Sequence, residues 1–110
     1  MPRYMHQFSY STEAVRGLTT TPHNRKKAAA KLFKDAGGEL IDIYYCFGDY
    51  DGIVISEFPS NVDAAAVALA VGSSGGFSKM KTTVLITMDE AVAAMKKAKK
   101  VSGGYKPPSA

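Results

Sequence analysis

A hairpin signal between two apolar segments constrains the fold of this chain more than any other feature. The turn lies between Glu39–Cys46 and Ile53–Phe58, and its sequence is Phe47-Gly48-Asp49-Tyr50-Asp51-Gly52. The flanking segments are rich in β-branched and aromatic residues, which suit paired strands. Glycine and aspartate tolerate the positive φ angles that tight hairpins require. The sequence therefore predicts two antiparallel strands at the centre of the fold.

Upstream of the hairpin, the sequence predicts a strand, a short connection and a longer helix. Residues 4–10 alternate with a period of two, and the more apolar face carries Tyr4, His6, Phe8 and Tyr10. Residues 11–18 predict an irregular or helical connection. Thr21-Pro22 supplies a capping residue and a proline suited to the first helical position, so we expect a helix from there to about Ala36. Glycine ends this helix, because it adopts the left-handed conformation of helix C-termini.

Downstream of the hairpin, the sequence predicts two helices separated by a strand. At the start of each helix, a residue with a hydroxyl group lies three positions before a residue with a carboxylate, which is the pattern of a capping box. The two patterns begin at Ser60 and Thr87. Gly75-Gly76 interrupts the first helical pattern, and a strand is expected over residues 77–86. The second helix is expected to end near Lys100.

This order of elements predicts a single α+β domain. The succession β-α-β-β-α-β with an extra C-terminal helix is the ferredoxin-like plan, in which a four-stranded antiparallel sheet carries its helices on one face. A length of 110 residues, of which 45% are hydrophobic, suits one core. We expect the domain to span residues 1–100, and residues 101–110 to form a flexible C-terminal tail.

The predicted sheet is apolar on both faces. Strict alternation along the second strand places Ile41 and Ile43 on one face and Leu40 and Tyr44 on the other. An antiparallel sheet with one face in water alternates more cleanly than this. The helices of one chain cover only one face, and an exposed apolar face usually marks an interaction site. The sequence therefore predicts a homodimer in which two sheets pack face to face.

The amino-acid composition limits the cellular compartment and the classes of binding partner that we expect. Cys46 is the only cysteine, which excludes an intramolecular disulfide and agrees with a reducing, cytoplasmic location. No apolar run approaches the ~18 residues that span a bilayer, so no membrane partner is expected. The net charge is +4, and the basic residues concentrate in two predicted helical segments, 25–34 and 96–100, which we assign to solvated helix faces in preference to a phosphate-binding surface. The strand over 53–58 lacks the basic and aromatic pattern of an RNA-recognition motif, so no nucleic-acid partner is expected.

The sequence Gly48-Asp49-Tyr50-Asp51 resembles the signature of the GYD domain family. The resemblance extends over roughly Tyr4 to Thr87 and includes Arg25, Gly37-Gly38 and the strand that ends at Pro59. It implies a ferredoxin-like domain of the dimeric α/β-barrel type. The family has no established common biochemical activity, so the resemblance implies an architecture and leaves the ligand open.

Several side chains are candidates for a site between the sheet and its helices. His6 lies on the apolar face of the first strand, where it is either a general base or a hydrogen-bonded core histidine. Arg25 must find an anionic ligand or an ion-pair partner, for which Asp51 and Glu57 are the candidates. Tyr50 and Asp51 either line the rim of a pocket or stabilise the turn. The predicted ligand-binding residues are Tyr4, His6, Phe8, Arg25, Tyr45, Tyr50 and Asp51.

These residues support two functional hypotheses. The first is a homodimeric small-molecule-binding or accessory domain. The alternative is a cofactor-independent oxygenase or isomerase of small aromatic or lactone substrates, with His6 or Tyr50 as the acid or base, by analogy with other proteins of this fold. The sequence does not decide whether the protein is an enzyme. No cofactor is expected, and no metal is expected because His6 and His23 show no recognisable ligand spacing.

Overall fold

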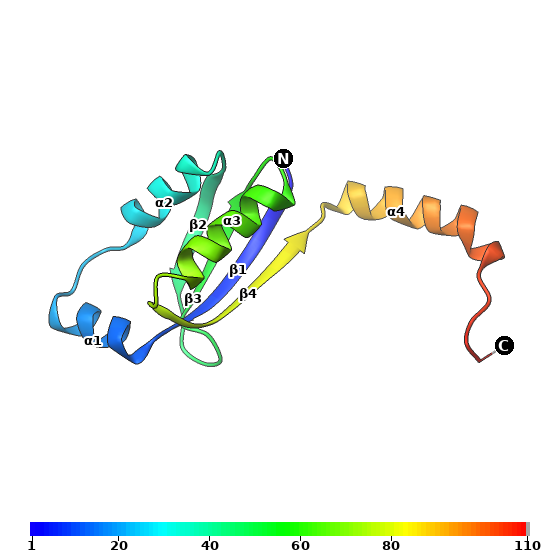
Figure 1. The fold of residues 1–110 in the computed structure, drawn as a ribbon. Coiled ribbons are helices and arrows are strands. Elements are labelled where there is room, and N and C mark those ends of the chain that lie inside the picture. Colours follow the sequence, from blue (N-terminus) through cyan, green and yellow to red (C-terminus); the bar gives the residue numbers. More distant parts are fainter. Residues whose placement is uncertain (110) are drawn as a thin grey trace.

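A four-stranded antiparallel sheet with two helices on one face forms the body of the molecule (Figure 1). The computed structural model describes residues 1–109, so the last residue of the predicted tail, Ala110, lies outside the described residues. The strands pair in the order β2-β3-β1-β4, and the predicted α+β class is confirmed. Their bounds are β1 (Arg3–Tyr10), β2 (Glu39–Tyr45), β3 (Gly52–Glu57) and β4 (Phe77–Leu85). The helices are α1 (Thr12–Thr20), α2 (Lys26–Asp35), α3 (Asn61–Gly72) and α4 (Met88–Val101), and η1 (Ser102–Gly104) is a short 3-10 turn.

The first helical region differs from the sequence prediction. The connection over residues 11–18 is helical, which is one of the two predicted alternatives, but a loop follows α1 and α2 starts at Lys26 instead of Pro22. The side chain of Ser11 caps α1 by accepting a hydrogen bond from the Ala14 N–H at 3.1 Å. The Asn24 side chain accepts the Lys26 N–H at 2.8 Å. Such local side-chain bonds compete with a continuous helix, so α2 begins four residues later than predicted.

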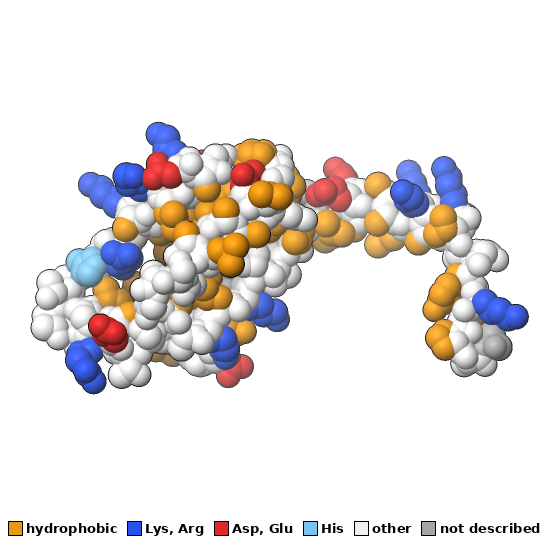
Figure 2. Space-filling view, in the orientation of Figure 1, with side chains coloured by type: hydrophobic (Ala, Val, Ile, Leu, Met, Phe, Trp, Pro, Cys, Tyr) orange, Lys and Arg blue, Asp and Glu red, His pale blue; other side chains and the backbone are white. Residues whose placement is uncertain are grey.

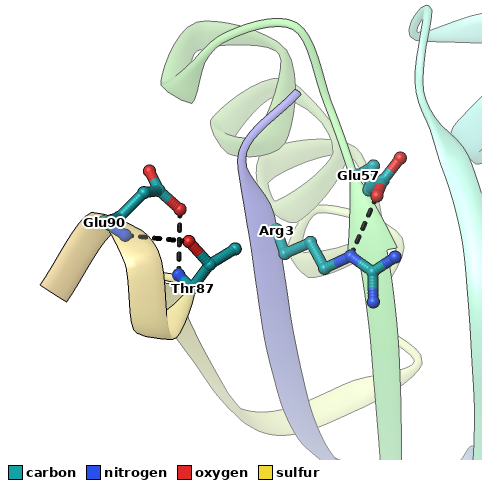
Figure 3. Close-up of polar contacts among 4 residues, drawn as sticks. All are labelled: Arg3, Glu57, Thr87 and Glu90. Carbon is teal, nitrogen blue, oxygen red and sulfur yellow. Dashed lines mark hydrogen bonds and ion pairs between the residues drawn. The ribbon is translucent and has the colours of Figure 1, made fainter. Parts of the chain in front are cut away.

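One of the two predicted capping boxes is present. Thr87 accepts the Glu90 N–H at 3.0 Å, and Glu90 accepts the Thr87 N–H at 2.9 Å (Figure 3). At the start of α3, the Ser60 hydroxyl instead donates to the Asp63 carboxylate at 3.0 Å and makes no bond to the backbone. The prediction for Thr87 is therefore confirmed, and the prediction of a complete capping box at Ser60 is wrong.

The core lies between the sheet and the two helices that cover it. Phe58 is fully buried and packs edge-on against Tyr4, with ring centroids 5.9 Å apart. The Tyr4 hydroxyl is satisfied by the Asn61 side-chain oxygen at 2.7 Å, at the start of α3. The other buried apolar residues are Phe8, Phe33, Val54, Ala64 and Val67. The sheet face that packs on this core is called the inner face below.

A bulge in β2 changes which residues lie on the inner face. Leu40 is opposite Ser56 and Asp42 is opposite Ile55, so Ile41 is the extra residue. Leu40 and Ile43 therefore both pack against the core. The prediction that Leu40 lies on the opposite face from Ile43 is wrong, because strict alternation fails where an extra residue is inserted.

Among residues 1–109, no helix covers the opposite face, which is called the outer face (Figure 1). The apolar part of its centre consists of Met5, Ile53 and Ile55, which are paired or adjacent across β1 and β3, and the polar Gln7 lies beside them on β1, opposite Ile53. Its β2 edge carries the acidic residues Glu39 and Asp42, and its β4 edge carries the basic residues Lys79 and Lys81. At one end, Arg3 donates to Glu57 at 2.9 Å (Figure 3). This face is therefore an apolar centre between edges of opposite charge.

Helix α4 extends away from the sheet instead of packing on it (Figure 1). The radius of gyration is 17.9 Å, compared with about 13 Å for a compact domain of similar length. Met88, Val92 and Met95 recur at helical spacing and are exposed. Figure 2 shows hydrophobic side chains along one side of this helix. Among residues 1–109, no helix is long and apolar enough to cross a bilayer.

The hairpin turn is attached to the end of β1. Asp51 donates its N–H to the Phe8 carbonyl at 2.8 Å, and its carboxylate accepts the Tyr10 N–H at 2.9 Å. Gly48 has a φ of 137°, which favours glycine. Gly52 lies opposite Phe8 in the sheet, and the Phe8 ring occupies the space that a Cβ at position 52 would need. The close approach of the Phe8 side chain to the backbone therefore requires glycine at position 52.

We expect Gly52→Ala to lower the free energy of unfolding by about 1–3 kcal/mol, because the buried Phe8 ring must move. Chemical denaturation measures this change. Gly17→Ala is the matched control, because a Cβ at this helical position meets nothing within 4 Å and alanine favours helices. The double variant Gly52→Ala/Phe8→Leu should lose less stability than the two single changes added together. Additive losses would contradict the steric explanation.

Candidate functional site

A cavity of about 260 Å³ lies between the inner face of the sheet and helices α2 and α3. Its lining is mainly apolar, and it also contains the polar side chains of His6, Tyr10, Arg25 and Ser74. Figure 2 shows hydrophobic side chains gathered over this part of the molecule, with basic side chains around them. The apolar lining includes Phe8, Leu32, Phe33, Ile43, Val54, Val67, Ala68, Val71, Phe77 and Met80.

His6 is buried at the sheet side of the cavity, and both of its ring nitrogens have partners. Nε2 lies 2.7 Å from the Ser56 hydroxyl, and Nδ1 lies 3.1 Å from the Thr82 hydroxyl. The Phe33 ring packs edge-on against the imidazole, with ring centroids 5.6 Å apart. Burial lowers the pKa of His6 from 6.5 to about 4, so the ring is neutral near pH 7. His6 therefore contributes no positive charge to the cavity.

Two tyrosines form a hydroxyl pair on the inner face where β1 and β2 end. The hydroxyls of Tyr10 and Tyr45 are 2.8 Å apart, and their ring centroids are 6.0 Å apart. Burial raises the pKa of Tyr10 well above its ordinary value, and the hydrogen bond between Tyr10 and Tyr45 raises it further. Tyr10 lines the cavity, whereas Tyr45 lines a shallower groove next to it. The pair holds neutral hydroxyl groups beside the cavity.

Arg25 lies where the cavity and this groove meet, because it lines both of them. The groove has a volume of about 580 Å³, and its other lining residues are Pro22, His23, Asn24, Lys26, Ile43, Tyr44 and Tyr45. Within residues 1–109, no carboxylate forms an ion pair with Arg25. The predicted pairing with Asp51 or Glu57 is therefore wrong: Glu57 pairs with Arg3, and Asp51 accepts the Tyr10 N–H.

The structure separates the predicted site residues into two groups. His6, Phe8 and Arg25 line the cavity, and Tyr45 lines the groove. Tyr4, Tyr50 and Asp51 line neither. The ring of Tyr50 instead lies under the ammonium group of Lys79, which is 4.4 Å from the ring centroid. These positions place the hairpin turn away from the cavity.

Sequence reasoning missed Tyr10 and the residues that α3 contributes. Tyr10 follows His6 and Phe8 on the same alternating strand face, so its place on the inner face was readable in the sequence. Ala68 and Val71 line the cavity from α3. The hydrophobic spacing of an alanine-rich helix does not reveal which of its positions border an empty space.

The described residues offer little for metal or thiol chemistry. Among residues 1–109, no group of three or more His, Cys, Asp or Glu side chains is placed to hold a metal ion. The Cys46 thiol donates to the Tyr50 carbonyl at 3.1 Å and is half-buried. The arrangement is suited to holding an apolar molecule, with polar contacts available only from the groups named above.

Comparison with known proteins identifies a family and a fold. The sequence profile of the GYD domain matches residues 4–95. No curated protein matches the chain. The solved structure of MtbAldR is similar, with 13% identity and a TM-score of 0.59 over 78% of this chain and 53% of that protein.

Two further solved structures share the fold. Transcriptional regulator NMB0573 from Neisseria meningitidis, solved as a complex with L-Met, has 10% identity and a TM-score of 0.57 over 79% of this chain and 51% of that protein. The chain thus spans about half the length of this regulator and of MtbAldR. TTHA0845 from Thermus thermophilus has 12% identity and a TM-score of 0.52 over 79% of this chain and 95% of that one. At these identities the likeness shows the fold alone.

The family match agrees with the resemblance predicted from the hairpin turn. It extends over the sheet, both covering helices and the turn that carries Gly48-Asp49-Tyr50-Asp51, and it reaches into α4. The match therefore concerns the whole folded body and is not restricted to a short motif. The chain belongs to the GYD domain family.

Proposed function

We propose that this protein is a homodimeric small-molecule-binding domain whose ligand site is the cavity between the sheet and helices α2 and α3. The observation that carries the proposal is the cavity itself, which is preformed, mainly apolar and bordered by a few polar groups. Small-molecule sites in proteins have this character. A domain that serves only as a structural support gains nothing from such a space, because an unfilled cavity lowers stability.

The structural neighbours are compatible with binding. The regulator from N. meningitidis was solved with L-Met, so this fold also occurs in a protein that holds a small molecule. This support is an analogy between folds, and it does not transfer the ligand.

The positions of the two candidate acid–base residues favour binding over the alternative of a cofactor-independent oxygenase or isomerase. Both ring nitrogens of His6 already have hydroxyl partners, and Tyr50 lies under Lys79 and outside the cavity. A general base must come within hydrogen-bond reach of the proton that it removes. Neither residue presents a free polar atom to a molecule in the cavity.

The proposed dimer covers the outer face with a second copy of this chain. The apolar centre of this face is flanked by the acidic edge on β2 and the basic edge on β4. A two-fold axis parallel to the strands stacks the β2 edge of one copy on the β4 edge of its partner, so that edges of opposite charge lie on the same side of the interface, with Asp42 level with Thr83 and Lys81 level with Tyr44. This self-complementarity is what a symmetric interface requires. The same dimer leaves the cavity on the far side of each sheet.

Filling the cavity provides the test of the proposed binding site. We expect the neutral probe 3-phenylpropan-1-ol to bind the wild-type protein, and Ala68→Phe to weaken this binding about tenfold or more, because Ala68 lines the cavity. Ala65→Phe is the matched control, since Ala65 is an exposed residue of the same helix outside the lining. Ligand-observed NMR titration measures both affinities. Unchanged binding to Ala68→Phe would show that the probe binds elsewhere.

A further inference from the structure

We infer that the cavity binds a small carboxylic acid with an aromatic or branched apolar body, and that Arg25 binds its carboxylate at the mouth. This inference rests on the proposed function and specifies the ligand class of the same site. It follows from three observations: the apolar interior, a cation without a carboxylate partner at the junction with the groove, and the absence of acidic residues from both linings within residues 1–109.

The interior determines the body of the ligand. Aromatic and aliphatic side chains from β1, β3, β4, α2 and α3 surround the space of about 260 Å³. An apolar cavity of about 150 Å³ is sufficient for benzene. The present cavity is therefore large enough for one aromatic ring or a branched chain with a short substituent. A longer chain would have to extend into the groove.

The interior also excludes a charged group from its deep end. The imidazole of His6 is neutral near pH 7, and its two nitrogens are already bonded to Ser56 and Thr82. A carboxylate placed there would lose its water without gaining an opposite charge, which is costly. The charged end of the ligand must therefore face the mouth.

Arg25 is suited to receive that charge. Within residues 1–109 it is the only charged residue in the cavity lining, and Lys26 lies beside it in the groove. A guanidinium binds a carboxylate through two parallel hydrogen bonds, which gives direction as well as affinity. Tyr10 lines the same cavity, and Asp51, whose carboxylate accepts the Tyr10 N–H, lies outside both linings.

The tyrosine pair provides one additional donor. Two hydroxyls carry two protons, and only one of them lies in the 2.8 Å contact between Tyr10 and Tyr45. The other proton remains available for an oxygen at the mouth of the cavity. Arg25 and the pair together offer donors and no negative charge, which distinguishes an acid from an amine or a neutral molecule.

The experiment compares an acid and an alcohol of the same shape. We expect 3-phenylpropionate to bind the wild-type protein about tenfold or more tightly than 3-phenylpropan-1-ol, because hydrogen bonds to charged groups are the stronger ones. Arg25→Gln should remove this difference by weakening acid binding more than alcohol binding, and a circular-dichroism spectrum and a denaturation midpoint like those of the wild-type protein show that the variant is folded. Lys26→Gln is the matched control and should retain most of the preference, because Lys26 lines the groove but not the cavity.

Each alternative result would contradict one specific part of the inference or of the proposed function. Equal affinity for the acid and the alcohol in the wild-type protein would overturn the carboxylate inference and leave the proposed binding function intact. A preference that persists in Arg25→Gln, or that is lost equally in Lys26→Gln, would overturn the role of Arg25. Failure of both probes to bind would contradict the proposed function as well.

Discussion

The Ile55→Asp substitution is expected to convert the proposed homodimer into a monomer at micromolar concentration. Ile55 lies at the centre of the outer face, opposite Met5 on one side and Asp42 on the other. A carboxylate at position 55 would be buried in the interface beside the like charge of Asp42, and an uncompensated buried charge costs several kcal/mol. The dimer dissociation constant should therefore increase about a hundredfold or more. Sedimentation equilibrium measures the constant directly.

Ala66→Asp is the matched control for this change. Ala66 is an exposed residue of α3, on the opposite side of the sheet, so the same charge is added to a surface that the proposed dimer leaves free. This variant should remain dimeric. If the wild-type protein itself sediments with the mass of one 110-residue chain, the dimer proposal is wrong, whatever the variants do.

The strand pattern of the sequence was sufficient to predict most of the sheet. The alternation of residues 4–10 correctly placed Tyr4, His6 and Phe8 on the buried face, because a strand with one covered face repeats every two residues. The turn sequence correctly located the hairpin between β2 and β3. The strand face and the hairpin turn both depend on residues that are close in the sequence, so the sequence pattern was sufficient to predict them.

Two differences arise where local patterns have several structural outcomes. The bulge at Ile41 moves Leu40 to the inner face, and no residue type in this segment marks the extra residue. The second helix starts at Lys26 instead of Pro22, because the Asn24 side chain accepts the Lys26 N–H and stabilises a loop before the helix. In both cases the sequence pattern is compatible with more than one local conformation, so it does not predict which one forms.

The candidate site was harder to predict because it depends on the distance between elements. His6, Phe8 and Arg25 line one cavity, since a strand face and the start of its covering helix meet in this fold. The sequence allowed Tyr50 either to line the rim of a pocket or to stabilise the turn, and this residue lies outside both linings, where its ring contacts Lys79. A motif that identifies a family therefore need not lie at the ligand site.

Acidification is expected to destabilise the folded protein through His6. Burial lowers the pKa of this residue to about 4, compared with 6.5 for an unburied histidine. Between these two values the unfolded chain binds a proton that the folded chain does not bind. Above pH 6.5 His6 is neutral in both states and its pKa shift costs no stability. As the pH falls from 6.5 to 4, protonation of His6 in the unfolded chain lowers the free energy of unfolding. Below pH 4 His6 is protonated in both states and lowers it no further. A difference of about 2.5 pKa units corresponds to roughly 3 kcal/mol.

Denaturant unfolding at a fixed protein concentration between pH 7 and pH 4 measures this loss. His6→Gln should be less stable at pH 7, because Ser56 and Thr82 lose the imidazole, but its stability should change much less over this interval. His23→Gln is the matched control and should retain the full pH dependence, since His23 is exposed. The pKa of Glu90 is lowered by its hydrogen bonds with Thr87, so its own effect belongs to the acidic end of the range. If His6→Gln loses as much stability as the wild-type protein, carboxylates dominate acid unfolding and the neutral state of the buried imidazole is not what limits it.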